Sequence, residues 1–251
     1  RTITRPSFVE MAPFLYQESY GSAQIRGNAD LKNGYNYNLD LRYEFFGENG
    51  YMFSATAYYK HLEDPIEQIQ QLSGGATIHS FQNANNGMAA GLEVEFRKEL
   101  IRDLRLGANA SFMYTDVKLP EGGAYTNTQR ALQGASPYLV NAGLFYQHDD
   151  KGISASLLYN RIGKRIESVG VPMQDQNEDI PDIYEMPRNS LDLTFSKKIG
   201  KAVEIKAGIQ DMLNSKIEYK QFVKLTDQNG GKREREQLVR SYRPGVDINV
   251  G

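Results

Sequence analysis

Residues 188–214 read RNSLDLTFSKKIGKAVEIKAGIQDMLN, and the last ten residues, 242–251, read YRPGVDINVG. In 191–196, and again in 203–210, every second residue is apolar, and a short charged segment separates the two runs. Alternation with a period of two predicts β-strands that have one apolar and one polar face. The chain then continues through a long polar segment and returns as a further alternating run at its end. This order predicts a hairpin, a long connection and another strand.

The rest of the chain repeats the same unit, and about ten strands of roughly 8–14 residues are expected, long enough to cross a bilayer at a barrel tilt. Short turns are expected at 47–50, which is a tight turn by composition, at 99–103, at 148–152 and at the charged segment 197–201. Long connections lie at 6–35, 66–87, 118–136, 168–187 and 215–240. Strict alternation of short turns and long loops is typical of a transmembrane β-barrel and unusual in a soluble sandwich. The sequence therefore predicts an all-β, antiparallel up-and-down meander.

Composition narrows the class of protein. The 251 residues are 40% hydrophobic and 24% charged, with 16 Tyr, 11 Phe and no Trp, which is not a disordered composition. No run of ~18 apolar residues exists, so a membrane helix is excluded while a barrel is not. The net charge of −2 argues against a nucleic-acid partner. Without Cys there are no disulfides and no Cys-based metal sites. Because residues 1–4 read like the middle of a strand, a fragment is expected.

Short motifs spread over nearly the whole chain carry a resemblance to a known family. They are RTITRPSF (1–8), GNADLK (27–32), AYYK (57–60), PIE (65–67), GLEVE (91–95), LQGASPY (132–138), YNRIG (159–163), DMLN (211–214) and YRPG (242–245). Each is weak alone, but their order and their places on the strand pattern are specific. The chain resembles the C-terminal part of the β-barrel of TonB-dependent outer-membrane receptors, in the subgroup that often carries an N-terminal carboxypeptidase-regulatory-like domain.

The resemblance implies a barrel of about 22 strands, plugged by an N-terminal domain, in the cell outer membrane. It implies active uptake of a scarce nutrient such as an iron–siderophore complex, with no enzymatic activity and no cofactor. The implied partners are the TonB complex, reached through the plug, together with outer-membrane lipid, lipopolysaccharide and an unknown small-molecule ligand. Residues 1–251 contain no plug, no TonB box and no aromatic-ended final strand, so they are expected to form only part of such a receptor.

The polar strand faces supply candidate site residues. Asp40, Arg42, Glu44, Glu93, Glu95 and Arg97 fall in phase opposite apolar rows. On the lipid side of a barrel each charge would cost a few kcal/mol, so they are expected to face the lumen. In the receptor that the resemblance implies, this wall contacts the plug. Packing against the plug and cross-strand ion pairing are favoured over substrate binding.

The long connections supply the candidates for ligand contact, which are Tyr16, Tyr20, Tyr125 and Tyr184. An exposed aromatic ring could stack on a sugar or a siderophore, although packing within the loops explains these residues equally well. Siderophore, cobalamin, peptide and glycan all stay open as ligands.

Other polar groups favour no catalytic or metal site. The histidines, His61, His79 and His148, are expected on solvated surface, and no nucleophile, zinc or phosphate-loop motif is present. Asp175, Glu178, Asp179 and Asp182 form an acidic loop that could hold Ca²⁺ but matches no EF-hand. The charge run 232–236 could meet lipopolysaccharide phosphates, although a solvated loop or a strand extension is favoured.

A binding module and an enzyme are the two alternatives to a membrane transporter. A soluble or surface-exposed β-sandwich that binds carbohydrate or protein would bury the aromatic rows between two sheets. An enzyme on a β scaffold would need a convergent acid–base or nucleophile set, which the sequence lacks.

Overall fold

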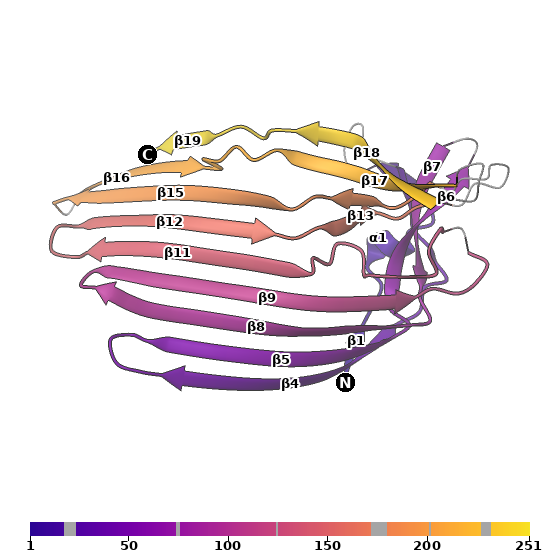
Figure 1. The fold of residues 1–251 in the computed structure, drawn as a ribbon, viewed down its shortest axis with the longest axis horizontal. Helices are drawn as coiled ribbons and strands as arrows, with labels where there is room; N and C mark the ends of the chain where they lie inside the picture. The colour runs from indigo at the N-terminus through magenta and orange to yellow at the C-terminus, as the bar shows by residue number, and fades with distance from the viewer. Residues whose placement is uncertain (18–23, 74–75, 124, 172–179, 201, 227–231) are drawn as a thin grey trace.

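In a computed structural model of the chain, one large antiparallel sheet occupies most of the molecule, and its long strands run side by side (Figure 1). The structure describes residues 1–17, 24–73, 76–123, 125–171, 180–200, 202–226 and 232–251. In the order in which they pair, the strands are β1 (Thr2–Thr4), β4 (Gly34–Phe46), β5 (Met52–Glu63), β8 (Asn86–Ile101), β9 (Leu104–Lys118), β11 (Tyr138–His148), β12 (Ile153–Ile162), β15 (Arg188–Ile199), β16 (Val203–Gln210) and β19 (Asp247–Val250). The short β10 (Gln129–Arg130) pairs with β9 beside this path. The predicted meander is confirmed.

Short turns connect the long strands at one end of the sheet, on the left of Figure 1. In the β4–β5 turn, Asn49 and Gly50 have φ angles of 55° and 65°. This left-handed pair suits the twist of a tight hairpin, and Asn-Gly adopts it readily. Gly152 and Gly200 have φ angles of 59° and 65° in two of the other turns. The turn chemistry therefore fixes the strand register at this end.

The alternation read from the sequence becomes two distinct sheet faces. Paired residues lie on the same face, and the register joins Leu41, Ala57 and Leu92 across three strands. Many large side chains of this apolar face are between 36% and 77% exposed. They include Leu39, Leu41, Tyr43, Phe45, Tyr59, Leu92, Phe112, Tyr114, Leu144, Leu157, Phe195, Ile205, Ile248 and Val250. No second sheet covers this face in the described part of the chain, so the alternative of a β-sandwich that buries the aromatic rows is wrong.

At the opposite end, on the right of Figure 1, the long connections fold into two small sheets. One contains β2 (Leu15–Gln17), β3 (Gln24–Arg26), β7 (Ala76–Asn83) and β6 (Ile66–Ser73). The other contains β13 (Arg165–Ser168), β14 (Ile183–Glu185), β17 (Ile217–Thr226) and β18 (Lys232–Tyr242). The expectation of plain loops at 66–87 and 215–240 is therefore wrong. We call these two sheets, with the connections between them, the cap.

A short helix, α1 (Phe8–Met11), also belongs to the cap. Its N-cap is a capping box, in which Glu10 N donates to Ser7 Oγ at 3.2 Å and Ser7 N donates to Glu10 Oε2 at 2.6 Å. Both bonds satisfy backbone donors that a helix N-terminus leaves free. Among the described residues, none of the helical segments is long and apolar enough to span a membrane.

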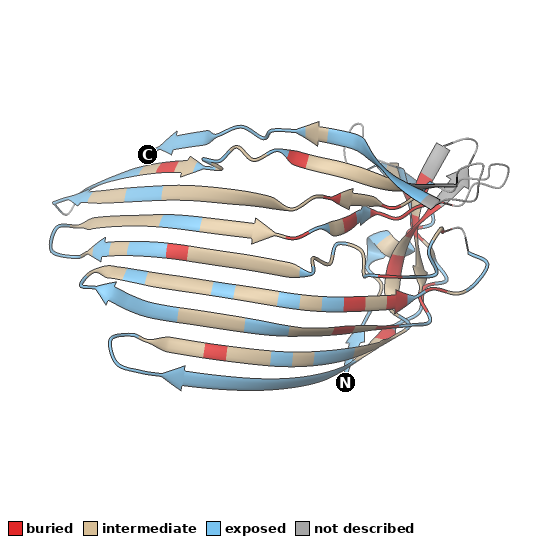
Figure 2. Ribbon diagram, in the orientation of Figure 1, coloured by how far each residue is buried: buried red, intermediate tan, exposed pale blue. Residues whose placement is uncertain are grey.

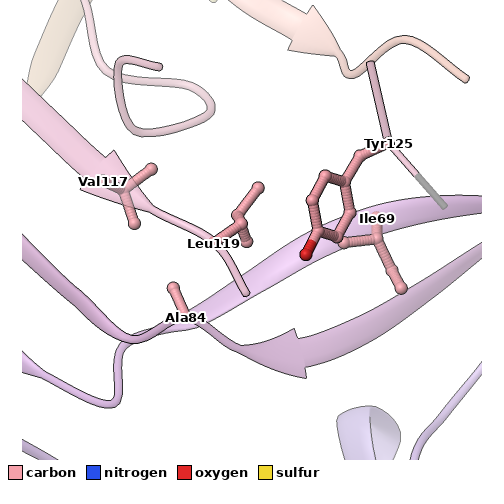
Figure 3. Packing of buried hydrophobic residues seen from close by; sticks show 5 residues of the cluster. All are labelled: Ile69, Ala84, Val117, Leu119 and Tyr125. Carbon is pink, nitrogen blue, oxygen red and sulfur yellow. The ribbon is translucent and has the colours of Figure 1, made fainter. Parts of the chain in front are cut away.

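Buried residues gather where the long strands meet the cap (Figure 2). A cluster of Ile69, Ala84, Val117, Leu119 and Tyr125 forms the core there, and Figure 3 shows these side chains pointing toward one another. Val117 lies near the end of β9, Ile69 lies in β6, and Ala84 directly follows β7. The core therefore fastens the cap to the large sheet.

Candidate functional site

The six charged residues predicted to share a lumenal wall do lie on one face of the sheet. Asp40, Arg42 and Glu44 are on β4, and Glu93, Glu95 and Arg97 are on β8. The intervening β5 shows that these two groups share a face, because Thr56 pairs with both Arg42 and Glu93. This is the polar face, opposite the exposed apolar rows.

The ion pairs on the polar face do not join neighbouring strands, as the sequence had led us to expect. Arg42 Nη2 lies 2.7 Å from Glu44 Oε1, and Arg97 Nη2 lies 2.5 Å from Glu95 Oε1. Both pairs join alternate residues of one strand, so the predicted cross-strand ion pairs are wrong at these positions. The physical reason is the register, which sets Ser54 and Thr56 of β5 between the two charged strands. Exposed pairs of this kind contribute about 0–1 kcal/mol each.

A ladder of asparagines continues the polar face across the next strands. Asn141 Nδ2 donates to Asn109 Oδ1 at 2.8 Å, and Asn160 Nδ2 donates to Asn141 Oδ1 at 2.6 Å. The residues belong to β9, β11 and β12 and lie directly opposite one another. The middle amide, that of Asn141, therefore accepts from Asn160 and donates to Asn109 along a row perpendicular to the strands.

The polar face borders a hollow of about 820 Å³. Charged groups such as Glu95, Arg97 and Asp192 line it together with the asparagine ladder, and Phe145 and Leu158 add apolar surface. A concave surface with polar groups on an apolar background can hold another folded segment or a small molecule. Nothing in this arrangement brings together a nucleophile with a base, or paired carboxylates with a proton to transfer.

The cap contains a buried ion pair that the sequence did not reveal. Arg130 Nη1 lies 2.9 Å from Glu67 Oε2, and these side chains are 4% and 7% exposed. Burial raises the pKa of the Glu67 carboxyl, and the nearby Arg130 charge opposes that rise. Arg130 also donates to the backbone oxygen atoms of Gln68 and Ala131. The pair thus ties β6 to β10.

His79 of β7 lies between two glutamine side chains of β6. Gln68 Nε2 is 3.0 Å from the ring Nδ1, and Gln70 Nε2 is 3.2 Å from the ring Nε2. Gln70 also bonds to Ser168 Oγ of β13. Burial lowers the pKa of His79, which favours the neutral ring. The expectation of a solvated histidine is therefore wrong at this position, because β7 packs inside the cap.

The tyrosines proposed as ligand contacts have different environments. Tyr125 is 6% exposed and packs in the core (Figure 3), so packing within the loops describes it better than ligand contact. Tyr184 is half-buried against Phe222, with ring centroids 5.7 Å apart, and Lys164 Nζ lies 4.4 Å from its ring centroid. Tyr16 of β2 packs at an angle to Phe14. Tyr20 lies outside the described residues.

The structure describes some of the residues in the predicted acidic loop and in the charge run 232–236. Asp182 is 4% exposed, and its two oxygens accept bonds from Gly170 N at 2.7 Å and Asn127 Nδ2 at 2.9 Å, so it is neither solvated nor free for a metal. Asp175, Glu178 and Asp179 lie outside the described residues. The charge run 232–236 begins β18, which confirms the strand reading. Within the described ranges, no three acidic or histidine side chains form a metal-binding group.

The sequence carries little signal for the cap residues. Residues 66–73 read IEQIQQLS, and neither set of alternate residues is consistently apolar. The pattern therefore does not distinguish the strand β6 from a glutamine-rich loop. No local pattern connects Glu67 to Arg130, because their contact joins segments far apart in the chain.

Comparisons with known proteins agree with this geometry. Residues 1–244 match the model of a family described as outer membrane protein beta-barrel family. No similar sequence was found among curated proteins. Among solved structures, the chain is similar to a mutant of the ferric enterobactin receptor PfeA from Pseudomonas aeruginosa, with 18% identity and a TM-score of 0.58, covering 92% of this chain and 32% of the receptor.

Two further structures show the same fold. The siderophore receptor PirA from Pseudomonas aeruginosa is 17% identical, with a TM-score of 0.55 and coverage of 84% of this chain and 34% of PirA. The copper transporter OprC is 15% identical, with a TM-score of 0.59 and coverage of 95% and 34%. The chain therefore spans about a third of the length of these proteins. At such identities the likeness concerns the fold.

Proposed function

Because the chain belongs to the outer membrane protein beta-barrel family, we propose that it forms part of an active transporter that imports a scarce nutrient across the outer membrane. The resemblance to a barrel segment of TonB-dependent receptors is confirmed for family and fold. The cell outer membrane is its location. The nutrient proposed first is an iron–siderophore complex, since the chain is similar in fold to a ferric enterobactin receptor and to a siderophore receptor.

One observation carries the proposal: the long sheet has exposed large apolar side chains on one face and is mainly polar on the other face, which borders the 820 Å³ hollow. Lipid accepts the first face and not the second, since a charge facing lipid costs roughly 2–4 kcal/mol near the bilayer midplane. The long connections of outer-membrane barrels are extracellular. Because the cap is built from the long connections of this chain, it would lie outside the cell. A ligand would meet the cap first and the polar wall afterwards.

Residues 1–251 would be the C-terminal part of the barrel, and the polar wall would contact a plug domain supplied by another part of the receptor. Asp40, Arg42, Glu44, Glu93, Glu95 and Arg97 would face that plug. Of these six residues, Glu95 and Arg97 line the 820 Å³ hollow, where they pair with each other within β8. The TonB complex would act on the plug, and the cap would lie near lipopolysaccharide.

Adjacent residues of β8 test which face meets lipid. The chain contains no cysteine, so Leu92→Cys and Glu93→Cys would each add one thiol for a fluorescent label in the full-length protein reconstituted with brominated lipids. Leu92 is 44% exposed on the apolar face, so its label is expected to be quenched, whereas the label at Glu93 is not. Equal quenching at both positions would contradict the assignment of the faces.

Energy-dependent uptake tests the transport function. Cells that have the full-length protein as their sole candidate receptor would be given radiolabelled ferric enterobactin. Accumulation is expected, and a protonophore is expected to stop it, because energy would pass from the inner membrane. Accumulation that continues with the protonophore would indicate a passive pore. No accumulation would overturn this ligand as the nutrient.

A further inference from the structure

One arginine lies on the apolar face of the large sheet, at the end of β12 that borders the cap (Figure 1). The register places Arg161 between Val140 of β11 and Asn189 of β15. Along β12 the other residues of this face carry no charge, and from the short turn to the cap they are Ile153, Ala155, Leu157 and Tyr159. None of the functions described above uses this cation at the end of an apolar row.

The place of Arg161 along the strand corresponds to the edge of a bilayer. Arg161 follows Ile153 by eight positions, which is about 27 Å along a strand and about 20 Å across the membrane at a barrel tilt near 40°. The apolar band of an outer-membrane barrel is about 25 Å tall, and an arginine side chain can extend its charged end toward the headgroups. A cation at this depth avoids most of the penalty that it would have at the bilayer midplane.

Polar and aromatic side chains surround the guanidinium and hold its orientation. Arg161 Nη1 donates to Asn189 Oδ1 at 2.8 Å, and the Tyr159 hydroxyl donates to the same oxygen at 2.8 Å. The ring centroid of Tyr138 lies 5.9 Å from Arg161 Cζ. Gly163 makes room for this ring, since a Cβ there would lie 2.9 Å from Tyr138 Cε1. The guanidinium is therefore positioned by β11 and β15 before any ligand binds.

The positive charge of Arg161 is not compensated by a carboxylate. In the ranges that the structure describes, no Asp or Glu oxygen lies within 4.0 Å of its guanidinium. A guanidinium has five N–H donors. The bond to Asn189 takes one, and the hydroxyls of Tyr138 and Tyr159 lie close enough to accept others, so two or more stay available. A group of donors without a carboxylate suits an anion whose oxygens only accept, and a phosphate matches the planar fork of arginine.

From these observations we propose that Arg161, with Asn189 and Tyr138 beside it, binds the phosphate of a membrane lipid headgroup in the leaflet that borders the cap. Charge complementarity favours a phosphate, and the apolar surface on the short-turn side of Arg161 favours one that carries acyl chains. Leu144 and Leu157, paired on neighbouring strands of that surface, are 37% and 36% exposed. The inference rests on the proposed function in one respect, because it requires the apolar face to meet lipid.

Lipid binding to the full-length protein tests the inference. The protein is purified in detergent and freed of bound lipid, and native mass spectrometry then counts the lipids that it retains. Dioleoyl phosphatidic acid is the probe, and dioleoylglycerol, which has the same acyl chains and no phosphate, is its control. Phosphatidic acid is expected to bind more tightly, and inorganic phosphate at the same concentration is not expected to displace it.

Three variants locate the site. Arg161→Gln is expected to weaken phosphatidic acid binding about tenfold at one site, since a charged hydrogen bond is lost, and to leave dioleoylglycerol binding unchanged. Arg161→Lys retains the charge and is expected to recover most of the binding, which separates loss of the charge from misfolding. Arg105→Gln is the matched control, because Arg105 is exposed and lacks an ion pair with the described residues, but lines the 820 Å³ hollow on the polar face. That variant is expected to bind as the unaltered protein does.

Four results would overturn the inference: equal binding of dioleoylglycerol, unchanged binding by Arg161→Gln, equal weakening by Arg105→Gln, or displacement by inorganic phosphate. The last would mean that the site takes free phosphate rather than a lipid headgroup. Brominated-lipid quenching at Leu92 and Glu93 judges the proposed function separately. Quenching at Leu92 with unchanged binding by Arg161→Gln would overturn only the phosphate site, whereas no quenching at Leu92 would overturn the lipid-facing assignment and the site with it.

Discussion

The large sheet exposes many of its apolar side chains, whereas the cap buries the apolar side chains of its core. In the sheet, Leu41 is 76% exposed and Ile248 is 69% exposed, while the polar side chains line a hollow. In the cap, Ile69 and Leu119 are each 3% exposed and pack together in the core. One chain therefore contains two regions that suit different solvents.

The difference shows that solvent, rather than residue type, decides what is buried. A strand that meets lipid exposes its apolar residues without a hydrophobic penalty, so the sheet needs no interior core. The cap meets water and must bury apolar surface, although its small core leaves space for buried polar groups such as Arg130 and Glu67. The stability of the sheet should therefore depend on keeping charged residues off its apolar face. The stability of the cap should depend on its buried ion pairs and hydrogen bonds.

The largest expected effect compares the same substitution in both regions. Glu67→Gln leaves the guanidinium of Arg130 without a charged partner at 4% exposure, and losing one partner of a buried pair costs about 3–5 kcal/mol. Glu95→Gln frees Arg97, which is 64% exposed, and should cost less than about 1 kcal/mol. Hydrogen exchange of the β6 and β5 amides in the full-length protein measures each opening free energy. Similar losses in both variants would contradict the comparison.

A charge introduced on the sheet should produce the next largest effect. Leu41→Arg places a cation on the apolar face and should destabilise the protein in lipid by roughly 2–4 kcal/mol. Asn38→Arg, on the polar face of the same strand β4, is the control and should cost little. Urea unfolding in lipid vesicles provides the two free energies of unfolding. A small loss for Leu41→Arg would mean that this face does not meet the bilayer.

Sequence alone predicted the sheet because the information is local. Alternation at 203–210 and the Asn49–Gly50 turn determine face and register without reference to distant residues. The common face of Arg42 and Glu93 followed from the same periodicity. What the periodicity does not contain is the pairing partner of each side chain, so the ion pairs within one strand were missed.

The cap was not predictable in the same way, because its contacts are non-local. β3 pairs in parallel with β7, from another connection, and Gln70 bonds to Ser168. Such contacts depend on how the connections pack against one another and leave no periodic signature. For the same reason Tyr125 could not be distinguished, in the sequence, from an exposed ring.

The asparagine ladder should make a smaller contribution on the polar face. Asn141→Ala removes the bonds to Asn109 and Asn160 and should cost about 1 kcal/mol. A double-mutant cycle with Asn109→Ala separates their coupling from the two single losses, and roughly 0.5–1 kcal/mol is expected for residues in contact. Additive losses would show that the ladder gives no cooperative support, in contrast to the cap network.

The smallest effect should be a pH dependence confined to the cap. Because the pKa of folded His79 is lowered by burial, the unfolded state takes up a proton before the folded state does as pH falls below about 6.5. Stability of the β6–β7 hairpin should therefore decline as pH falls through the unfolded pKa, and level off below the folded pKa. A protonated ring would need two acceptors, yet Gln68 Oε1 already accepts from Gln133.

The comparison with His79→Gln isolates this contribution. Glu67 and Glu167, whose folded pKa values are raised by burial, gain stability as pH falls toward their ordinary range, but they are present in both proteins and cancel in the difference. Hydrogen exchange of β6 and β7 amides, corrected for intrinsic rates, should show the unaltered protein losing protection relative to His79→Gln between neutral pH and about 5, while β11 amides stay unchanged. If the two proteins respond identically, the bonds from Gln68 and Gln70 hold the ring in either protonation state, and the cap tolerates a buried charge as readily as the polar face does.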